Sequence, residues 1–135
     1  MTFVDANILL RFLTKQPPEQ ARDIFERAQR LEFNLVIDPL ILAEVIYVLL
    51  GVYSYSHERV KDELLALLST EVVRFEAVGL ERAAIDALSK LSLKLDFPDV
   101  YLAARARLSG GQVVSFDKGF GLLEVDWLNP GSNDG

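Results

Sequence analysis

The stretch FVDANILLRFLT, residues 3–14, places a short run of strand-forming residues, one acid and an apolar helix in direct succession. Its first residues favour an extended chain, and the apolar side chains after Asp5 recur at the three- and four-residue spacing of a helix. The same order returns in LVIDPLILAEVIYVLL, residues 35–50, and in QVVSFDKGF, residues 112–120. A strand that ends at an acid and leads into a helix is therefore the recurring unit of this chain.

Short apolar strands alternate with helices along the rest of the chain. This order predicts an α/β fold with a short, mainly parallel central sheet of four to five strands, flanked by helices. The expected strands are 2–5, 33–37, 72–75, 112–116 and 124–128. The expected helices are 7–14, 18–32, 40–52, 54–69, 80–95 and 98–109, with a helical turn at 117–123. We expect one domain, residues 1–129, followed by a flexible tail, residues 130–135.

The composition of the 135 residues narrows the class of protein. The chain has no cysteine, which excludes disulfides, zinc–thiolate sites and cysteine nucleophiles. Charged residues interrupt every apolar stretch before the ~18–20 residues that span a bilayer, so no membrane partner is expected. No secretory signal is visible at the N-terminus, and a cytoplasmic location is therefore predicted.

The charge of the chain bears on nucleic acids as partners. The net charge is −6, whereas phosphate binding normally leaves a basic excess. Nearly all of this imbalance rests on five acids, because without them 15 acids face 14 lysines and arginines. The five are Asp5, Glu44, Asp96, Asp99 and Asp117. The acidic charge is thus consistent with one local acidic site on an otherwise balanced surface.

Four of these acids, Asp5, Glu44, Asp99 and Asp117, stand at the edges of apolar runs. An ionised carboxylate in apolar surroundings costs several kcal/mol unless a cation or hydrogen-bond donors offset it. A hard divalent cation such as Mg²⁺ or Mn²⁺ would satisfy several carboxylates at once. Asp5 and Asp117 lie at the carboxyl ends of predicted strands, where parallel sheets bind ligands. The pattern therefore indicates a metal site.

Three of these four acids, and Asp96 as well, also have a structural interpretation as helix caps. Asp5 and Asp117 can each cap the helix or turn that follows. Asp96 and Asp99 resemble a capping box, since the first turn of a helix favours negative charge. Capping is the stronger interpretation for Asp96, whereas Asp99 can cap and bind a cation together.

Glu44 is predicted to lie among apolar neighbours on its helix, and a buried ion pair with Arg11 is the alternative to metal binding. Several basic residues are candidates for steering a phosphate backbone, although a solvated helix face is the favoured interpretation for each of them. These are Arg11, Lys15, Arg105, Arg107 and Lys118.

Other chemistries find little support. His57 is the one histidine and stands in a polar helix start, so no Ser-His-Asp triad can form. No glycine-rich nucleotide-binding motif is present. A phosphatase of small phosphoesters would need a nucleophile motif with two aspartates, but Asp5 is followed by Ala6 and Asn7.

Four segments taken together, FVDANILLRFL, LAEVIYVL, LDFPDVYLAARA and VVSFDKGF, resemble the PIN-domain family over nearly the whole chain. The resemblance is strongest to the small VapC-type toxin ribonucleases. By this resemblance, four residues match the acidic quartet of the family and three match supporting positions. The quartet is Asp5, Glu44, Asp99 and Asp117, and the supporting residues are Asn7, Asp96 and Ser115.

The resemblance implies a divalent-metal-dependent endoribonuclease, with Mg²⁺ or Mn²⁺ held by the quartet and Asp99 or Asp117 as candidate general base. It also implies a homodimer and a cognate antitoxin whose tail occupies a groove near the acids. The alternative is a catalytically weak or inactive PIN-like binding or scaffold module. Separately, the apolar runs at residues 40–55 and 64–68 predict a partly exposed patch that supports association.

Overall fold

Helices and short strands follow one another in the computed structural model, which describes residues 2–15, 18–30, 34–70, 73–75 and 79–131. The strands are β1 (Thr2–Phe3), β2 (Leu35–Ile37), β3 (Val73–Phe75), β4 (Gln112–Val114) and β5 (Asp126–Leu128). The helices are α1 (Ala6–Thr14), α2 (Pro18–Gln29), α3 (Pro39–Gly51), α4 (His57–Leu68), α5 (Leu80–Ser89) and α6 (Phe97–Leu108). Two short 3-10 helices are η1 (Leu91–Leu93) and η2 (Lys118–Leu122). The predicted α/β order is confirmed element by element.

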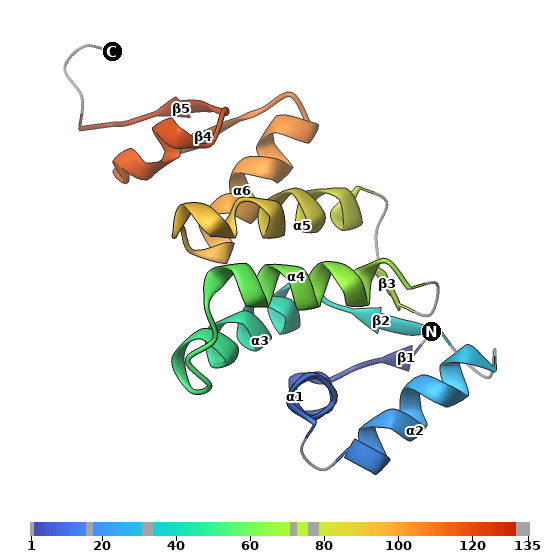
Figure 1. Cartoon of the computed structure of the whole chain (residues 1–135). Coiled ribbons are helices and arrows are strands. Elements are labelled where there is room, and N and C mark those ends of the chain that lie inside the picture. The colour runs from blue at the N-terminus through green and yellow to red at the C-terminus, as the bar shows by residue number, and fades with distance from the viewer. Residues whose placement is uncertain (1, 16–17, 31–33, 71–72, 76–78, 132–135) are drawn as a thin grey trace.

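The strands form two sheets, which differs from the single central sheet predicted from the sequence. The first sheet has the order β1-β2-β3, with all strands parallel and Leu35 opposite both Thr2 and Val73. The second sheet is the parallel pair β4-β5, with Val113 opposite Trp127. Within the described residues no ladder joins β1 to β4. The reason is that β4 follows α6, which packs against α5, so that these helices lie between the two sheets (Figure 1).

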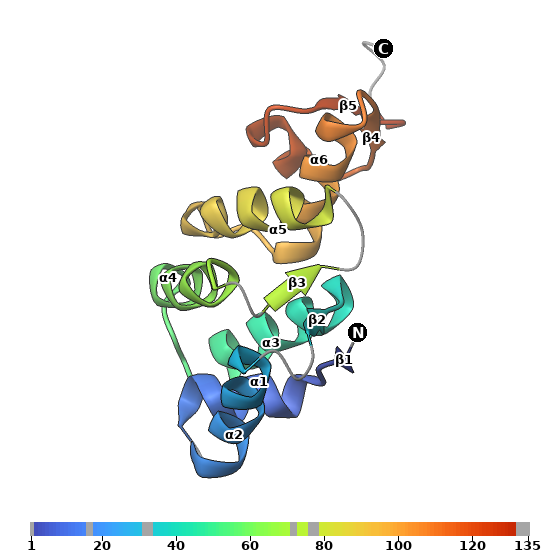
Figure 2. The ribbon, with the colours of Figure 1, turned by 90° about the vertical axis from the view of Figure 1, so that its right-hand side faces the viewer.

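The elements are stacked along one long direction of the molecule. α1 and α2 lie at one end, the first sheet with α3 and α4 follows, and α5 and α6 come next (Figure 1). β4, β5 and η2 form the other end, beside the C-terminus, and the view turned by 90° shows the same succession (Figure 2). The carboxyl ends of the first sheet are thus separated from those of the second by α6.

Local sequence signals set several helix ends. The Asp38 side chain accepts a hydrogen bond from the Leu40 N–H at 2.8 Å and Pro39 follows it, as predicted for the start of α3. The helix predicted over residues 80–95 is wrong at its end, because α5 stops at Ser89 and η1 follows. Lys94, which ends η1, adopts a left-handed conformation with φ of 60°.

The core is built around β2, whose three residues Leu35, Val36 and Ile37 are buried. Leu42, Val45, Ile46 and Leu49 of α3 pack into the same core. Of the two apolar runs expected to form an exposed patch, residues 64–68 instead contribute Leu64, Leu67 and Leu68 to the core. The run from residue 40 is exposed on one side only, with Leu40 80% and Tyr47 77% accessible.

The sequence also led us to expect no membrane partner and a flexible tail. In the part of the chain that the structure describes, no helix is both long and apolar enough to cross a bilayer. Residues 132–135 of the predicted tail lie outside the described residues, as do positions 31–33 and 72 of predicted elements.

Candidate metal centre

Asp5 stands at the end of β1 and caps α1. Its carboxylate oxygen Oδ1 accepts a hydrogen bond from the Ala6 N–H at 2.7 Å, and its carbonyl accepts from the amides of Ile8 and Leu9. The capping interpretation of Asp5 is therefore confirmed. The Asp5 side chain is exposed, and so is Asn7, the predicted supporting residue two positions on. An exposed carboxylate with one oxygen committed to a cap keeps its second oxygen available for a ligand.

Glu44 lies on the solvent side of α3, which contradicts the prediction that it sits among buried apolar neighbours. Leu42, Val45 and Ile46 take the core side of the helix, and Glu44 shares the opposite side with Leu40 and Tyr47. α3 is apolar on nearly all sides, so spacing alone could not tell which side would be buried. Among the described residues no ion pair joins Glu44 to Arg11, which is itself exposed.

Asp99 is half-buried in the first turn of α6. Burial raises the pKa of its carboxyl, and the nearby negative charges of Asp117 and then Asp96 raise it further. The structure therefore brings Asp99 and Asp117 close enough to repel one another. Asp96 has the backbone conformation of an N-cap but its exposed side chain makes no capping hydrogen bond, so the predicted capping box does not form.

Asp117 is held in place by its own loop. Its Oδ1 accepts from the Gly119 N–H at 2.8 Å, which confirms the predicted capping of η2. The Ser115 hydroxyl accepts from the Asp117 N–H at 3.0 Å, and the Trp127 indole N–H donates to the Ser115 carbonyl at 2.9 Å. Ser115 thus supports Asp117 through the backbone, and Trp127 anchors Ser115.

The candidate acids are divided between two places in the fold. Asp99 and Asp117, with Asp96 beside them, lie where α6 begins and β4 ends, whereas Asp5 and Glu44 belong to the elements around the first sheet. Within the described ranges, no three Asp, Glu, His or Cys side chains are placed to share one metal ion. A pair of carboxylates nevertheless suits Mg²⁺, which commonly takes one or two carboxylates and completes its shell with water and substrate phosphate. The Asp99–Asp117 pair fits such an ion, while a four-acid centre stays a prediction.

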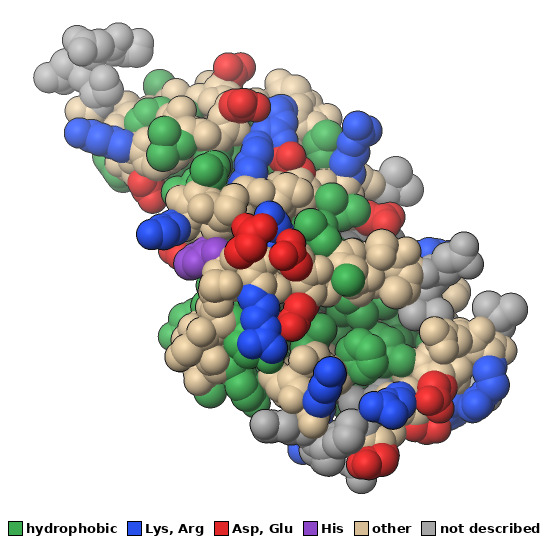
Figure 3. All heavy atoms as spheres, in the orientation of Figure 1, with side chains coloured by type: hydrophobic (Ala, Val, Ile, Leu, Met, Phe, Trp, Pro, Cys, Tyr) green, Lys and Arg blue, Asp and Glu red, His purple; other side chains and the backbone are tan. Residues whose placement is uncertain are grey.

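The basic residues singled out from the sequence fall into two groups. Arg11, Lys15, Arg105 and Lys118 are exposed. Arg107 is half-buried and ion-paired with Asp86 of α5, so its guanidinium is committed within the protein. On the face shown in Figure 3, lysines and arginines are interspersed with acids and form no basic stripe.

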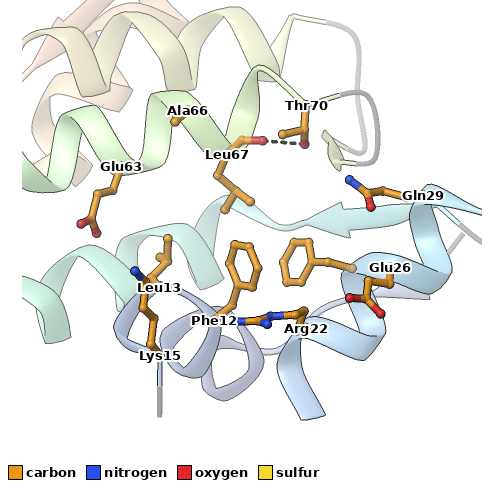
Figure 4. A pocket seen from close by; sticks show the side chains of 11 residues that line it. Phe12, Leu13, Lys15, Arg22, Glu26, Gln29, Glu63, Ala66, Leu67 and Thr70 are labelled. Atoms are coloured by element: carbon orange, nitrogen blue, oxygen red, sulfur yellow. Dashed lines mark hydrogen bonds between the residues drawn. The ribbon is translucent and has the colours of Figure 1, made fainter. Parts of the chain in front are cut away.

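A cavity of 620 Å³ opens between α1, α2 and α4. Its floor is apolar, with Phe12 and Phe25 stacked at a centroid distance of 4.0 Å and Leu67 opposite them (Figure 4). Charged side chains stand around it, among them Lys15, Arg22, Glu26 and Glu63. Hydrophobic side chains are visible in this hollow between α4 and α2 (Figure 3).

Tyr101 and Asp38 were not predicted to lie near one another. Burial raises the pKa of the Tyr101 hydroxyl, Arg105 lowers it, and the charge of Asp38 raises it. Asp38 was predicted only as the cap of α3, yet it brings the carboxyl edge of the first sheet within electrostatic reach of α6. No local motif predicts that Asp38 and Tyr101 lie near one another, because they are more than sixty positions apart in the sequence.

Comparison with known proteins finds a matching family and similar solved structures. A family model described as PIN domain matches residues 2–126. The crystal structure of VapBC2 from Rickettsia felis bound to a DNA fragment from its promoter is similar, with 18% sequence identity, a TM-score of 0.41, and coverage of 95% of this chain and 96% of that chain. No curated protein matches the sequence.

Proposed function

The chain belongs to the PIN-domain family, and from this premise we propose that it is a divalent-metal-dependent endoribonuclease. The observation that carries the proposal is the Asp99–Asp117 pair: burial raises the pKa of the Asp99 carboxyl, and the neighbouring charge of Asp117 raises it further. A cation between them would relieve this repulsion. Mg²⁺ or Mn²⁺ is the proposed cofactor because carboxylate oxygens are hard ligands.

In the proposed site, a bound divalent ion supplies activation of an attacking water and stabilisation of charge on the phosphoryl oxygens. Asp99 and Asp117 hold the ion, and either can accept the proton that the water releases. Ser115 and Gly119 keep Asp117 in position through the hydrogen bonds described above. Asp5, Glu44, Asn7 and Asp96 complete the predicted site, Asp5 and Glu44 as further ligands and the other two as supporting residues.

We also propose the biological setting that the family resemblance implies, a toxin with a cognate antitoxin and a homodimeric state. The apolar cavity between α1, α2 and α4 supports a peptide-like partner, because it combines an aromatic floor with charged edges. The exposed Leu40 and Tyr47 on α3 support association with a second copy. Residues 1–129 would form the nuclease domain, with 130–135 as its tail.

A second candidate function is a PIN-like binding or scaffold module without catalysis. It is favoured by the capping roles of Asp5 and Asp117, which give both acids a structural reason to be present. The two functions differ in whether RNA is cleaved.

The test is cleavage of a pool of structured RNAs by the purified chain in Mn²⁺ or Mg²⁺. We expect cleavage that EDTA abolishes and that Asp99→Asn and Asp5→Asn each reduce. Both variants are close in shape to the native side chain, and asparagine retains the capping ability of Asp5. Cleavage that survives in all three arms would mean a contaminating nuclease or another site. Mn²⁺ binding at the acids without cleavage of any RNA would favour the scaffold function.

A further inference from the structure

Arg107 joins three elements at the end of the molecule that carries Asp99 and Asp117. It lies in the last turn of α6, where its Nη1 donates to the carbonyl of Leu123 at 3.3 Å and its Nη2 pairs with Asp86 of α5. The side chains of Arg107 and Asp86 are only 32% and 33% exposed. A half-buried guanidinium with two partners is geometrically fixed, because its planar fork donates in set directions.

The elements that Arg107 joins are those that hold the acid pair. Asp99 precedes Arg107 by eight positions on α6, so both lie on the same side of that helix. Asp117 caps the start of η2, and Leu123, whose carbonyl accepts from Arg107, ends it. Arg107 thus links the far end of the helix that carries Asp99 to the far end of the turn that carries Asp117.

The near end of the Asp117 segment is fixed independently. The Ser115 hydroxyl accepts the Asp117 N–H, and Trp127 donates to the Ser115 carbonyl. The segment from Ser115 to Leu123 is therefore held at one end by Trp127 and at the other by Arg107. The hydrogen bond from Arg107 to the Leu123 carbonyl joins this segment to α6, the helix of Asp99.

We propose that Arg107 is a positioning residue, which sets the separation of Asp99 and Asp117 by locking α6, α5 and the end of η2 together. This role rests on the proposed function, since it concerns the acids assigned to the metal. It replaces phosphate steering as the role of Arg107, because the guanidinium is committed to Asp86 and Leu123. Exposed Arg105, two positions earlier, keeps its charge toward solvent.

When Arg107 is replaced, Asp86 still has one ion-pair partner. Asp86 also contacts Lys90, with 3.4 Å between Oδ2 and Nζ, and this Nζ has no hydrogen-bond partner of its own. Asp86 therefore does not become an unpaired half-buried charge in Arg107→Met. The variant is expected to fold, so its effect on the acid pair can be measured.

The experiment compares Arg107→Met and Arg107→Lys with Arg105→Met, which removes the same charge from the same helix. The readouts are the Kd for Mn²⁺ in the absence of RNA and the indole ¹H–¹⁵N signal of Trp127, the single tryptophan of the chain. We expect Arg107→Met to weaken Mn²⁺ binding by about 10- to 100-fold, the usual effect of losing a group that orients metal ligands. It should also shift the indole signal, whereas Arg107→Lys has an intermediate effect and Arg105→Met changes neither.

Two controls keep positioning apart from charge and from stability. An equal loss of Mn²⁺ affinity in Arg105→Met would overturn the proposal in favour of a charge effect. Val60→Ala, in the buried core of α4, should lower the melting temperature and leave the Mn²⁺ Kd unchanged. If it weakens Mn²⁺ binding as Arg107→Met does, the effect is one of global stability and positioning is overturned.

Failure of the proposed function can be distinguished from failure of the positioning role of Arg107. A wild-type chain that binds no Mn²⁺ refutes the metal site. The indole signal then still tests the link through Arg107, because it does not depend on metal. A shift in Arg107→Met but not in Arg105→Met supports positioning of the Asp117 segment, and an unchanged signal overturns it.

Discussion

The two sheets place their strand-end acids in different surroundings. Asp5, after β1, is exposed and serves α1 as a cap. Asp99 and Asp117, beside β4, repel one another, and Asp99 is half-buried. Asp5 and Asp117 thus each follow a strand and cap the next element, but Asp117 also lies within electrostatic reach of the half-buried Asp99. The difference shows that a strand-end acid indicates a ligand site only when a second acid or burial leaves its charge uncompensated.

The largest expected effect is on catalysis, and it tests whether the Asp99–Asp117 pair governs RNA cleavage. Asp99→Asn should reduce the rate of RNA cleavage by about 10²- to 10³-fold, as for the loss of one group that stabilises the transition state. Asp62→Asn, an exposed acid on α4, is the matched charge control and should leave the rate within about twofold. Initial rates at saturating Mn²⁺ measure both. Equal losses in the two variants would show that net charge, not the acid pair, governs cleavage.

The two sheets should also differ in local stability. β2 is buried throughout, whereas the β4–η2 region buries Val113, Phe120 and Leu123 but leaves Phe116 74% exposed. Regions with fewer buried apolar contacts open more readily. Amides of β4 should therefore exchange with solvent at least about 10-fold faster than those of β2, a difference of ~1.4 kcal/mol in opening free energy.

Hydrogen exchange followed by NMR measures this difference residue by residue. Added Mg²⁺ should slow amide exchange in β4 and η2 more than in β2, because the proposed ligands Asp99 and Asp117 lie beside β4 and η2. If the amides of β2 and β4 exchanged equally slowly without metal, the expected difference in local stability between the two sheets would be wrong.

Capping at the first sheet gives a smaller effect. Asp5→Ala should lower the free energy of unfolding by about 1 kcal/mol, because the Ala6 N–H loses its acceptor. Asp5→Asn should retain most of this stability, since asparagine caps as well as aspartate. Urea denaturation followed by circular dichroism measures both. A loss of cleavage in Asp5→Asn without a loss of stability, as the proposed function expects, would show that Asp5 is a ligand as well as a cap.

Much of the fold was predictable because it depends on local signals. Asp38 before Pro39, and Asp5 and Asp117 after short apolar strands, each form the cap that their sequence predicts. Sheet pairing could not be predicted in the same way, because pairing of β1 with β4 or of β4 with β5 depends on where α5 and α6 pack. The distance between these elements along the sequence does not show where the two helices pack.

The candidate site shows the same limit. Ser115 was assigned a supporting role, and its hydrogen bond to the Asp117 amide agrees with one. Glu44 was misplaced because a helix that is apolar on nearly all sides has no periodicity to orient it. Arg107 was taken for a surface cation because its partners, Asp86 and Leu123, are distant in sequence.

The smallest expected effect concerns pH and the acid pair. The pKa of Asp99 is raised in the folded chain, so the folded state holds its proton to higher pH than the unfolded state does. As pH rises above the ordinary value of 3.8, ionisation of Asp99 therefore lowers stability, and the loss is complete once pH exceeds the raised folded value. Asp99→Asn removes this loss, so the variant should melt above the wild type at pH 7 in EDTA, and this advantage should vanish below pH 3.8, where Asp99 is protonated in both states. Added Mg²⁺ should reverse the order at pH 7, because only the wild type gains a ligand that binds the folded state. A variant that melts below the wild type in EDTA would mean that the Asp99 carboxylate is stabilised by its surroundings, and the contrast between the two sheets would then not hold.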